Sequence, residues 1–186
     1  SHLVSCLDAD LPCPILIVQH LSVGFVDSLA EQLGRRTSLK VYAAKNQDVP
    51  KAGEIFVCPG GLHMKIKRNR FPQKGGLFEI CLDESALVND FRPSVDVLFS
   101  SIADHTHNNV LAVVMTGIGY DGAKGAEDLV KRAGGYVIIQ DKESSVVWGM
   151  PESVALLGVV SEIVPLELLG QRISRLVKGK AATNDS

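Results

Sequence analysis

The 186-residue sequence has no apolar stretch long enough to span a bilayer, and its first residues do not resemble a secretory signal. Its net charge is only −2, which gives no electrostatic basis for binding nucleic acid or an anionic membrane. The four cysteines (Cys6, Cys13, Cys58 and Cys81) form no closely spaced pair, so we expect free thiols rather than a disulfide framework. These absences favour a cytoplasmic enzyme or interaction domain.

What the sequence does contain is typical of one folded domain. Hydrophobic residues make up 46% of the chain and charged residues 22%, a balance that argues against disorder. We expect a single α/β domain over residues 1–178, followed by a polar, flexible C-terminal tail at residues 179–186.

Short apolar runs alternate with segments of helical periodicity through most of the chain. Strands are predicted at residues 15–18, 39–44, 54–58, 110–115, 136–140 and 159–164. Helices are predicted at residues 22–33, 93–103, 122–132 and 152–157 and from residue 165 onwards. This alternation predicts a layered α/β fold (Rossmann-like) with a mainly parallel sheet flanked by helices.

One part of the chain has a different period. Met64, Ile66 and Arg68 alternate with charged residues, and Phe78 and Ile80 continue the pattern. A period of two indicates strands with one wet face, so residues 63–70 and 76–82 are predicted to form an antiparallel β-hairpin insertion, with its turn at residues 69–75.

Two polar residues follow predicted strands and are candidates for chemistry. His20 comes after the run ILIVQ, and Asp121 follows the run VLAVVM and a glycine-rich turn. The carboxyl ends of parallel strands lie on one side of a sheet, so the two side chains can meet although they are far apart in sequence. Such a pair is the base and its orienting carboxylate in a nucleophilic triad, but a structural histidine and a helix-capping aspartate explain the residues equally well.

The segment TGIGYDG at residues 116–122 could direct backbone N–H groups at an anion. It lacks both the GxGxxG spacing and the P-loop lysine, which disfavours the alternative of a nucleotide-binding protein. His63, His105 and His107 show no metal-ligand spacing and are predicted to be solvated or loop histidines. No metal or organic cofactor is expected, and Arg92, Asp96 and Trp148 are expected to be structural.

Several motifs, in order, resemble the catalytic domain of the chemotaxis protein-glutamate methylesterases, the CheB family, over nearly the whole chain. The matching segments are ILIVQH (15–20), VCPGG with HM (57–64), FRPSVDVLFSS (91–101), MTGIGYDGAKG (115–125) and AGGYVIIQDKESSVVWGMP (133–151).

The resemblance implies a hydrolase that removes methyl esters from glutamates, and deamidates glutamines, on the cytoplasmic helices of chemoreceptors. It places His20 as the base and Asp121 as the orienting residue of a Ser-His-Asp triad. It also implies that the loop of Gly117, Ile118 and Gly119 contributes the oxyanion site, with Met150 near the cleft. The family commonly has methionine at the position of Ile118, a change of little consequence where a backbone N–H is the donor. A receiver domain often precedes the family's catalytic domain and is a possible partner.

The family's nucleophile lies in a Gly-x-Ser-Thr-Gly-Gly segment after the first core strand, and the sequence contains no such segment. Ser5 and Cys6 lack the flanking glycines of a nucleophile elbow. Two explanations are open. The sequence could omit the first strand and its serine, or the protein could be a degenerate, non-catalytic member that binds receptors or signalling partners.

Overall fold

The computed structural model describes residues 2–70 and 75–184. Its strands, in chain order, are β1 (Ile15–Ile17), β2 (Lys40–Ala43), β3 (Glu54–Val57), β4 (His63–Arg68), β5 (Phe78–Asp83), β6 (Leu111–Val114), β7 (Tyr136–Gln140) and β8 (Glu162–Val164). The helices are α1 (His2–Ser5), α2 (Val26–Gly34), α3 (Val95–Ala103), α4 (Ala123–Ala133), α5 (Gly149–Leu156) and α6 (Leu166–Asn184). The predicted alternation of strands and helices is confirmed.

The parallel strands form two three-stranded sheets, with the orders β1-β3-β2 and β6-β7-β8. The middle strands, β3 and β7, are covered on both faces; Ile55, Val57 and Val137 through Ile139 are fully buried. Continuous apolar runs suit such strands, because both faces must leave water. The α/β class with mainly parallel strands is therefore confirmed.

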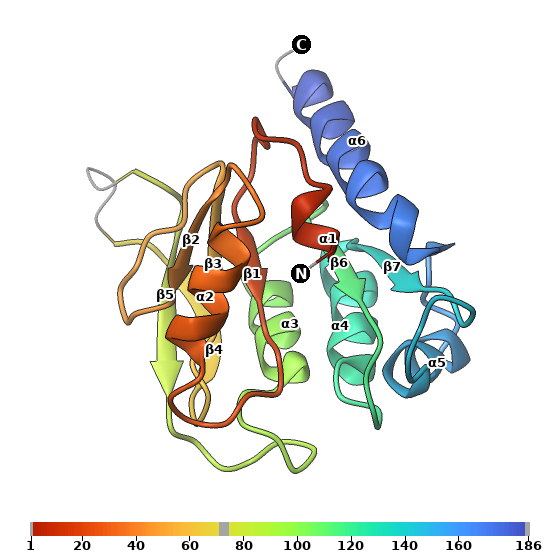
Figure 1. Cartoon of the computed structure of the whole chain (residues 1–186), viewed down its shortest axis with the longest axis horizontal. Helices are drawn as coiled ribbons and strands as arrows, with labels where there is room; N and C mark the ends of the chain where they lie inside the picture. Colours follow the sequence, from red (N-terminus) through yellow and green to blue (C-terminus); the bar gives the residue numbers. More distant parts are fainter. Residues whose placement is uncertain (1, 71–74, 185–186) are drawn as a thin grey trace.

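Strands β1 and β6 are the edges by which the two sheets face each other (Figure 1). In the described residues no strand pairs with the second edge of either one. All three residues of β1 are only half-buried, unlike those of a covered central strand. Unpaired strand edges tend to be avoided in stable domains, so these edges suit one more strand.

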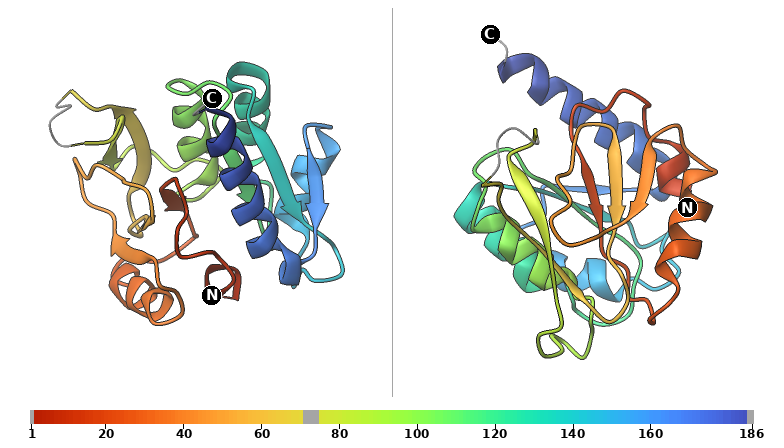
Figure 2. Two further views of the ribbon diagram at one scale, coloured as in Figure 1. Left: turned by 90° about the horizontal axis from the view of Figure 1, so that it is seen from above. Right: turned by 90° about the vertical axis from the view of Figure 1, so that its left-hand side faces the viewer.

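Helices cover both faces of this arrangement (Figure 2). The largest core cluster joins side chains of both sheets to α3, α4 and α5, for example Phe56 of β3, Leu98 of α3 and Val114 of β6. On the opposite face α2 packs on the first sheet and α6 on the second. Helix α3 thus lies behind the junction of the two sheets and ties them together.

The predicted antiparallel hairpin is confirmed as β4 and β5, paired from His63 opposite Asp83 to Arg68 opposite Phe78. Of its predicted turn, residues 71–74 lie outside the described residues. Met64, Ile66 and Ile80 face the core, whereas the alternate residues Lys65 and Lys67 are half-buried and exposed, respectively. The period of two in the sequence reports this division directly.

The largest differences from the predicted helix boundaries are in α2, α5 and α6, and α5 begins at Gly149 instead of residue 152. Helix α2 begins at Val26 instead of near Ser22, because residues 21–25 follow the rim of the sheet and Gly24 takes a left-handed φ of 90°. Helix α6 continues to Asn184, into the segment for which the sequence predicts a polar tail.

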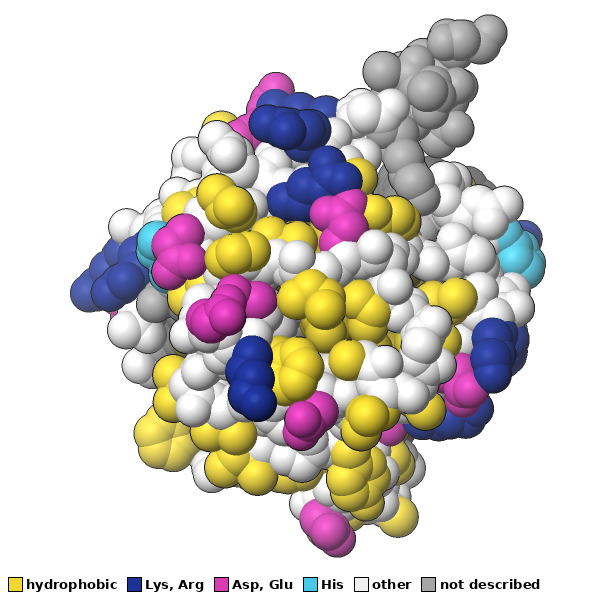
Figure 3. All heavy atoms as spheres, turned by 90° about the vertical axis from the view of Figure 1, so that its right-hand side faces the viewer, with side chains coloured by type: hydrophobic (Ala, Val, Ile, Leu, Met, Phe, Trp, Pro, Cys, Tyr) yellow, Lys and Arg dark blue, Asp and Glu magenta, His cyan; other side chains and the backbone are white. Residues whose placement is uncertain are grey.

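The surface over α5 and α6 mixes apolar side chains with charges of both signs (Figure 3). Leu156, Ile163 and Leu168 are each more than half exposed. A helix capable of crossing a membrane is not found among the described residues.

Candidate active site

His20 and Asp121 meet at the carboxyl ends of β1 and β6. The imidazole Nε2 of His20 lies 2.7 Å from Oδ2 of Asp121, and their side chains are 23% and 0% exposed. Because the carboxylate can only accept, Nε2 carries the hydrogen and Nδ1 is left with its lone pair. Nδ1 has no hydrogen-bond partner within the described chain. The predicted pairing of these residues is what the geometry shows.

Asp121 is held by the first turn of a helix that is not its own. Oδ2 also accepts a hydrogen bond from the backbone N–H of Val95 (2.7 Å), while Oδ1 accepts from that of Asp96 (3.2 Å) and from the Ser94 hydroxyl (2.6 Å). Free N–H groups and the helix dipole favour an anion there. Asp121 therefore caps α3, and not the following α4 as the capping interpretation supposes.

Asp96 makes the reciprocal contact. Its Oδ1 accepts the backbone N–H of Gly125 in α4 at 2.6 Å. The two helices approach closely at this point, since a Cβ on Gly125 would lie 2.6 Å from Cβ of Phe99. Each helix start thus receives a carboxylate from the other, which fixes Asp121 relative to α3.

The pKa values of Asp121 and Asp96 are shifted in opposite directions. Burial acts to raise the pKa of Asp121, but the hydrogen bonds from His20, Ser94 and Val95 outweigh it and lower the pKa to about 2. Burial, aided by the charge of Asp121, raises the pKa of Asp96 above its ordinary value despite the hydrogen bond from Gly125. Asp121 is accordingly ionised at neutral pH, as the orienting residue of a base must be.

The low pKa of Asp121 predicts a loss of stability in acid. Because the folded pKa, about 2, lies below the ordinary 3.8, the unfolded chain binds the proton more tightly. The stabilisation is complete above about pH 4 and disappears as the pH falls toward 2, and it amounts to about 2 kcal/mol. The difference in the free energy of unfolding between the parent and Asp121→Asn, measured with urea, should shrink by about that amount over this range.

The matched control is Asp90→Asn, because Asp90 is an exposed carboxylate nearby with no hydrogen bond among the described residues. Its difference from the parent should change little over the same range. A difference for Asp121→Asn that is independent of pH would show that the carboxylate is not stabilised in its ionised form.

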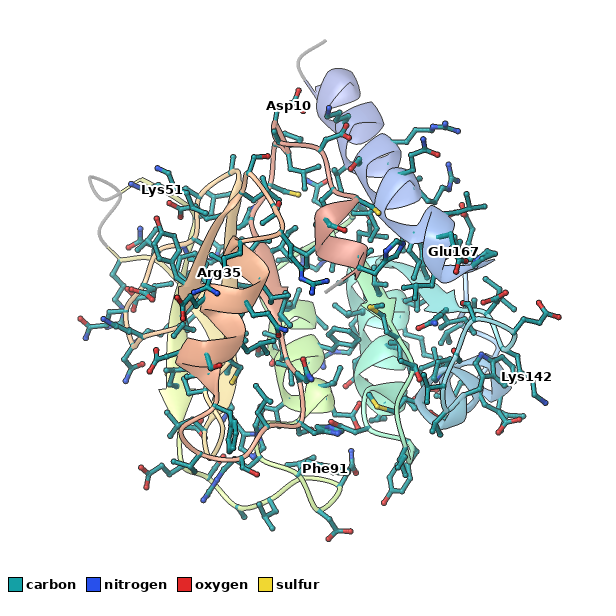
Figure 4. All side chains as sticks on the ribbon, in the orientation of Figure 1. Asp10, Arg35, Lys51, Phe91, Lys142 and Glu167 are labelled. Carbon is teal, nitrogen blue, oxygen red and sulfur yellow. The ribbon has the colours of Figure 1, made fainter. Side chains whose placement is uncertain are left out.

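A hairpin turn brings two further residues to the pair. Val88 and Phe91 exchange both backbone hydrogen bonds (3.1 and 3.0 Å), and Asn89 and Asp90 between them have φ of 52° and 67°. Two positive φ angles define the type I′ turn of tight hairpins. The ring of Phe91 stacks on His20 with centroids 3.7 Å apart and planes 2° from parallel. Figure 4 labels Phe91 in this loop, below the carboxyl ends of the strands.

An open cleft of about 410 Å³ adjoins His20. Its walls come from the segment after β1, from Gly61 and from the loop that precedes α3, and the lining includes Ser22, Asp90, Phe91 and Arg92. Ser22 shares the cleft but makes no hydrogen bond to His20 in the described structure. The cleft leaves one side of the imidazole, which is 23% exposed, open to solvent.

The base of the loop before α3 is anchored by His63 and Arg92. His63 is fully buried, so the prediction of a solvated or loop histidine is wrong for this residue. Its Nε2 lies 3.0 Å from the carbonyl oxygen of Ala86, and its Nδ1 accepts the N–H of Ser94 at 3.3 Å. The Arg92 guanidinium donates to the carbonyl oxygens of Glu84 and Ser85, the structural role predicted for it.

The glycine-rich loop after β6 lies on the other side of Asp121. The N–H of Gly117 donates to Val147 and its carbonyl accepts from the N–H of Met150, both at 2.9 Å. Met150 is buried with its sulfur over Gly117, where a Cβ would lie 2.2 Å from it. In the described structure the N–H groups of Ile118 and Gly119 donate to no protein group. Met150 thus backs the loop, which leaves two N–H groups free.

Gln140 is a buried residue that the sequence does not single out. At the end of β7, its Oε1 accepts the N–H of Thr116 at 2.9 Å, and its Nε2 donates to the carbonyl of Ser144 at 2.8 Å. It therefore ties the glycine-rich loop to the loop after β7. A glutamine at the end of an apolar strand was the available signal, since a buried amide needs partners.

The described residues contain no cluster of His, Cys, Asp and Glu side chains arranged to hold a metal ion. Burial raises the pKa of Cys58 to about 12, so this thiol is not a poised nucleophile. A parallel α/β fold with a histidine–carboxylate pair at its strand ends is the arrangement of hydrolases that use an activated nucleophile.

Comparison with known proteins identifies the family. The sequence profile described as CheB methylesterase matches residues 1–173. A protein-glutamate methylesterase/protein-glutamine glutaminase of Rhodopseudomonas palustris (strain BisB5) is 42% identical over 166 residues, and one of Symbiobacterium thermophilum is 39% identical over 171 residues. The alignments cover 89% and 92% of this chain. The chain belongs to the CheB methylesterase family.

The fold agrees with a solved relative. The crystal structure of the Thermotoga maritima CheB methylesterase catalytic domain matches with a TM-score of 0.87 at 35% identity, covering 94% of this chain and 89% of that one. The alignments span only 42% and 45% of the two curated relatives named above. The chain therefore corresponds to less than half of their length.

Proposed function

We propose that this chain provides the base and orienting residue of a protein-glutamate methylesterase that acts on chemoreceptor cytoplasmic helices in the cytoplasm. The hydrogen bond between His20 Nε2 and Asp121 Oδ2 carries the proposal, together with the names of the relatives. Glutamine deamidation at the same site is part of it. The longer gene product also contains a receiver domain in this proposal.

The reaction follows from the tautomer that Asp121 imposes. Nδ1 of His20 takes the proton of a serine hydroxyl as its oxygen attacks the ester carbonyl, and the carbonyl π electrons move to the oxygen. The N–H groups of Ile118 and Gly119, which donate to no group among the described residues, stabilise this oxyanion. The proton then passes to the leaving methoxide oxygen, which departs as methanol, or to the leaving amide nitrogen, which departs as ammonia when glutamine reacts. Water, deprotonated by His20, attacks the acyl-enzyme, and the proton passes to the serine oxygen as the glutamate carboxylate leaves.

The serine in this scheme is carried by a strand that pairs with the free edges of β1 and β6. Two observations support its place. Both edges lack a second partner in the described residues, and His20 and Asp121 lie at the carboxyl ends of these same strands. A parallel strand between them would end beside the pair, which is where a nucleophile is needed.

Methanol release from methylated receptor tests the proposal directly. The full-length gene product should release methanol, whereas the 186 residues alone should not. Ser22→Ala in the full-length product should not change the rate of acyl-enzyme formation, because Ser22 makes no hydrogen bond to His20 in the described structure. If Ser22→Ala abolished acylation, Ser22 would be the nucleophile, and the proposal that an additional strand carries the serine would be wrong. Absence of methanol release from the full-length product would favour the receptor-binding alternative.

A further inference from the structure

The side-chain amide of Asn89 lies between two buried carboxylates. Its Nδ2 is 2.7 Å from Oδ2 of Asp96 and 3.0 Å from Oδ1 of Asp121. A primary amide nitrogen carries two hydrogens, so each carboxylate can receive one of them. Asn89 does not line the cleft beside His20 and is not hydrogen-bonded to the imidazole.

The Asn89 amide reduces the repulsion between the two buried carboxylates of Asp96 and Asp121. Asp96 and Asp121 are 8% and 0% exposed, and each is fixed by the first turn of a helix. Carboxylates buried close together tend to share a proton, which lowers the charge on both. A proton shared with Asp96 would draw negative charge away from Oδ2 of Asp121 and weaken its hydrogen bond to His20. A neutral donor between the carboxylates removes the need for that proton.

The backbone is strained where it presents this amide. Asn89 and Asp90 both have left-handed φ angles, a conformation that costs free energy in residues other than glycine. Asparagine tolerates it best among such residues, and the turn has a firm base in the contacts of His63 and Arg92. The same turn carries Phe91, which stacks on His20. One two-residue turn therefore contacts both members of the pair.

We propose that Asn89 is a positioning residue for the His20–Asp121 pair. Its amide separates Asp121 from Asp96 and keeps the full charge of Asp121 directed at His20. Only the kinetic part of the test depends on the proposed function, since the hydrogen-bond part concerns the chain as it stands.

The hydrogen-bond test follows the imidazole N–H proton of His20 by NMR in this chain, assigned by its loss in His20→Gln. Asn89→Gly removes the amide and relieves the left-handed backbone, so lost stability does not obscure the result. Loss of the Asn89 amide should make the His20 N–H proton exchange with solvent about 10- to 100-fold faster, as expected for one hydrogen bond to a charged group. Gln47→Gly is the matched control, because Gln47 is exposed, has a φ of 67° and lies in the turn between β2 and β3.

The kinetic test uses the full-length gene product. Asn89→Gly should lower kcat by about 10- to 100-fold with KM unchanged, because the residue does not line the cleft beside His20. Asn89→Asp, which is isosteric but adds a third carboxylate, should lower kcat further. An unchanged proton exchange rate and kcat in Asn89→Gly would overturn the inference. Faster exchange in Asn89→Gly, combined with normal methanol release by His20→Gln, would support the positioning role and overturn the proposed function.

Discussion

Replacing His20 with Gln in the full-length gene product is expected to lower kcat for methanol release by about 10⁵-fold. The glutamine amide can still donate to Oδ2 of Asp121, so the buried carboxylate keeps its partner and the fold survives. What is lost is the lone pair of Nδ1, which in the proposed mechanism takes the proton of the nucleophile. The change should therefore act on kcat and leave substrate binding nearly unaltered.

His107→Gln is the matched control for this experiment. His107 is exposed in the turn after α3, and no hydrogen bond of its side chain is found in the described chain. Its replacement should change neither kcat nor KM. Activity of His20→Gln within tenfold of the parent would show that another group is the base, and circular dichroism of both variants would establish that they are folded.

The contact between His20 and Asp121 could be predicted because it depends on where the strands lie in the sequence, and apolar runs reveal the strands. Two apolar runs locate the parallel strands β1 and β6, and the loops that follow the carboxyl ends of parallel strands lie on the same side of the sheet. The hairpin of β4 and β5 was equally accessible through its period of two. In the first case the order of strands and loops in the sequence indicates which residues lie at the same edge of the sheet. In the second case the alternation of side chains indicates which residues face the core.

The residues that support the pair could not be predicted in this way. Asn89 reaches Asp121 only because the type I′ turn reverses the chain, and the sequence Asn-Asp is a weak signal for that turn. The capping of α3 by Asp121 depends on the approach of two helices, which no local pattern encodes. The burial of His63 is unpredictable for the same reason, since it comes from the loop before α3, which covers the start of β4.

Asp121→Asn is expected to lower kcat by about 10⁴-fold, although the side chain changes by only one atom and its attached hydrogens. The carboxylate accepts five hydrogen bonds: those from His20, Asn89, Ser94 and the N–H groups of Val95 and Asp96. An asparagine NH₂ in the place of Oδ1 could donate to the Ser94 hydroxyl, but it would also face the NH₂ of Asn89 and the N–H of Asp96, neither of which can accept. In the place of Oδ2 it would face the N–H of Val95 and would donate to Nε2 of His20. Nδ1 would then carry the imidazole hydrogen, and His20 could no longer act as a base there.

Ser94→Ala separates this tautomer effect from a general loss of support for Asp121. It removes one of the five donors and leaves both carboxylate oxygens able to accept, so the His20 hydrogen stays on Nε2. We expect the Ser94→Ala protein to lose about 10-fold in kcat and about 1–3 kcal/mol in stability, because one charged hydrogen bond is lost. ¹⁵N NMR of the imidazole should show Nε2 protonated in Ser94→Ala and Nδ1 protonated in Asp121→Asn. Equal losses of kcat in the two variants, with the same tautomer in both, would mean that Asp121 acts only by stabilising the start of α3.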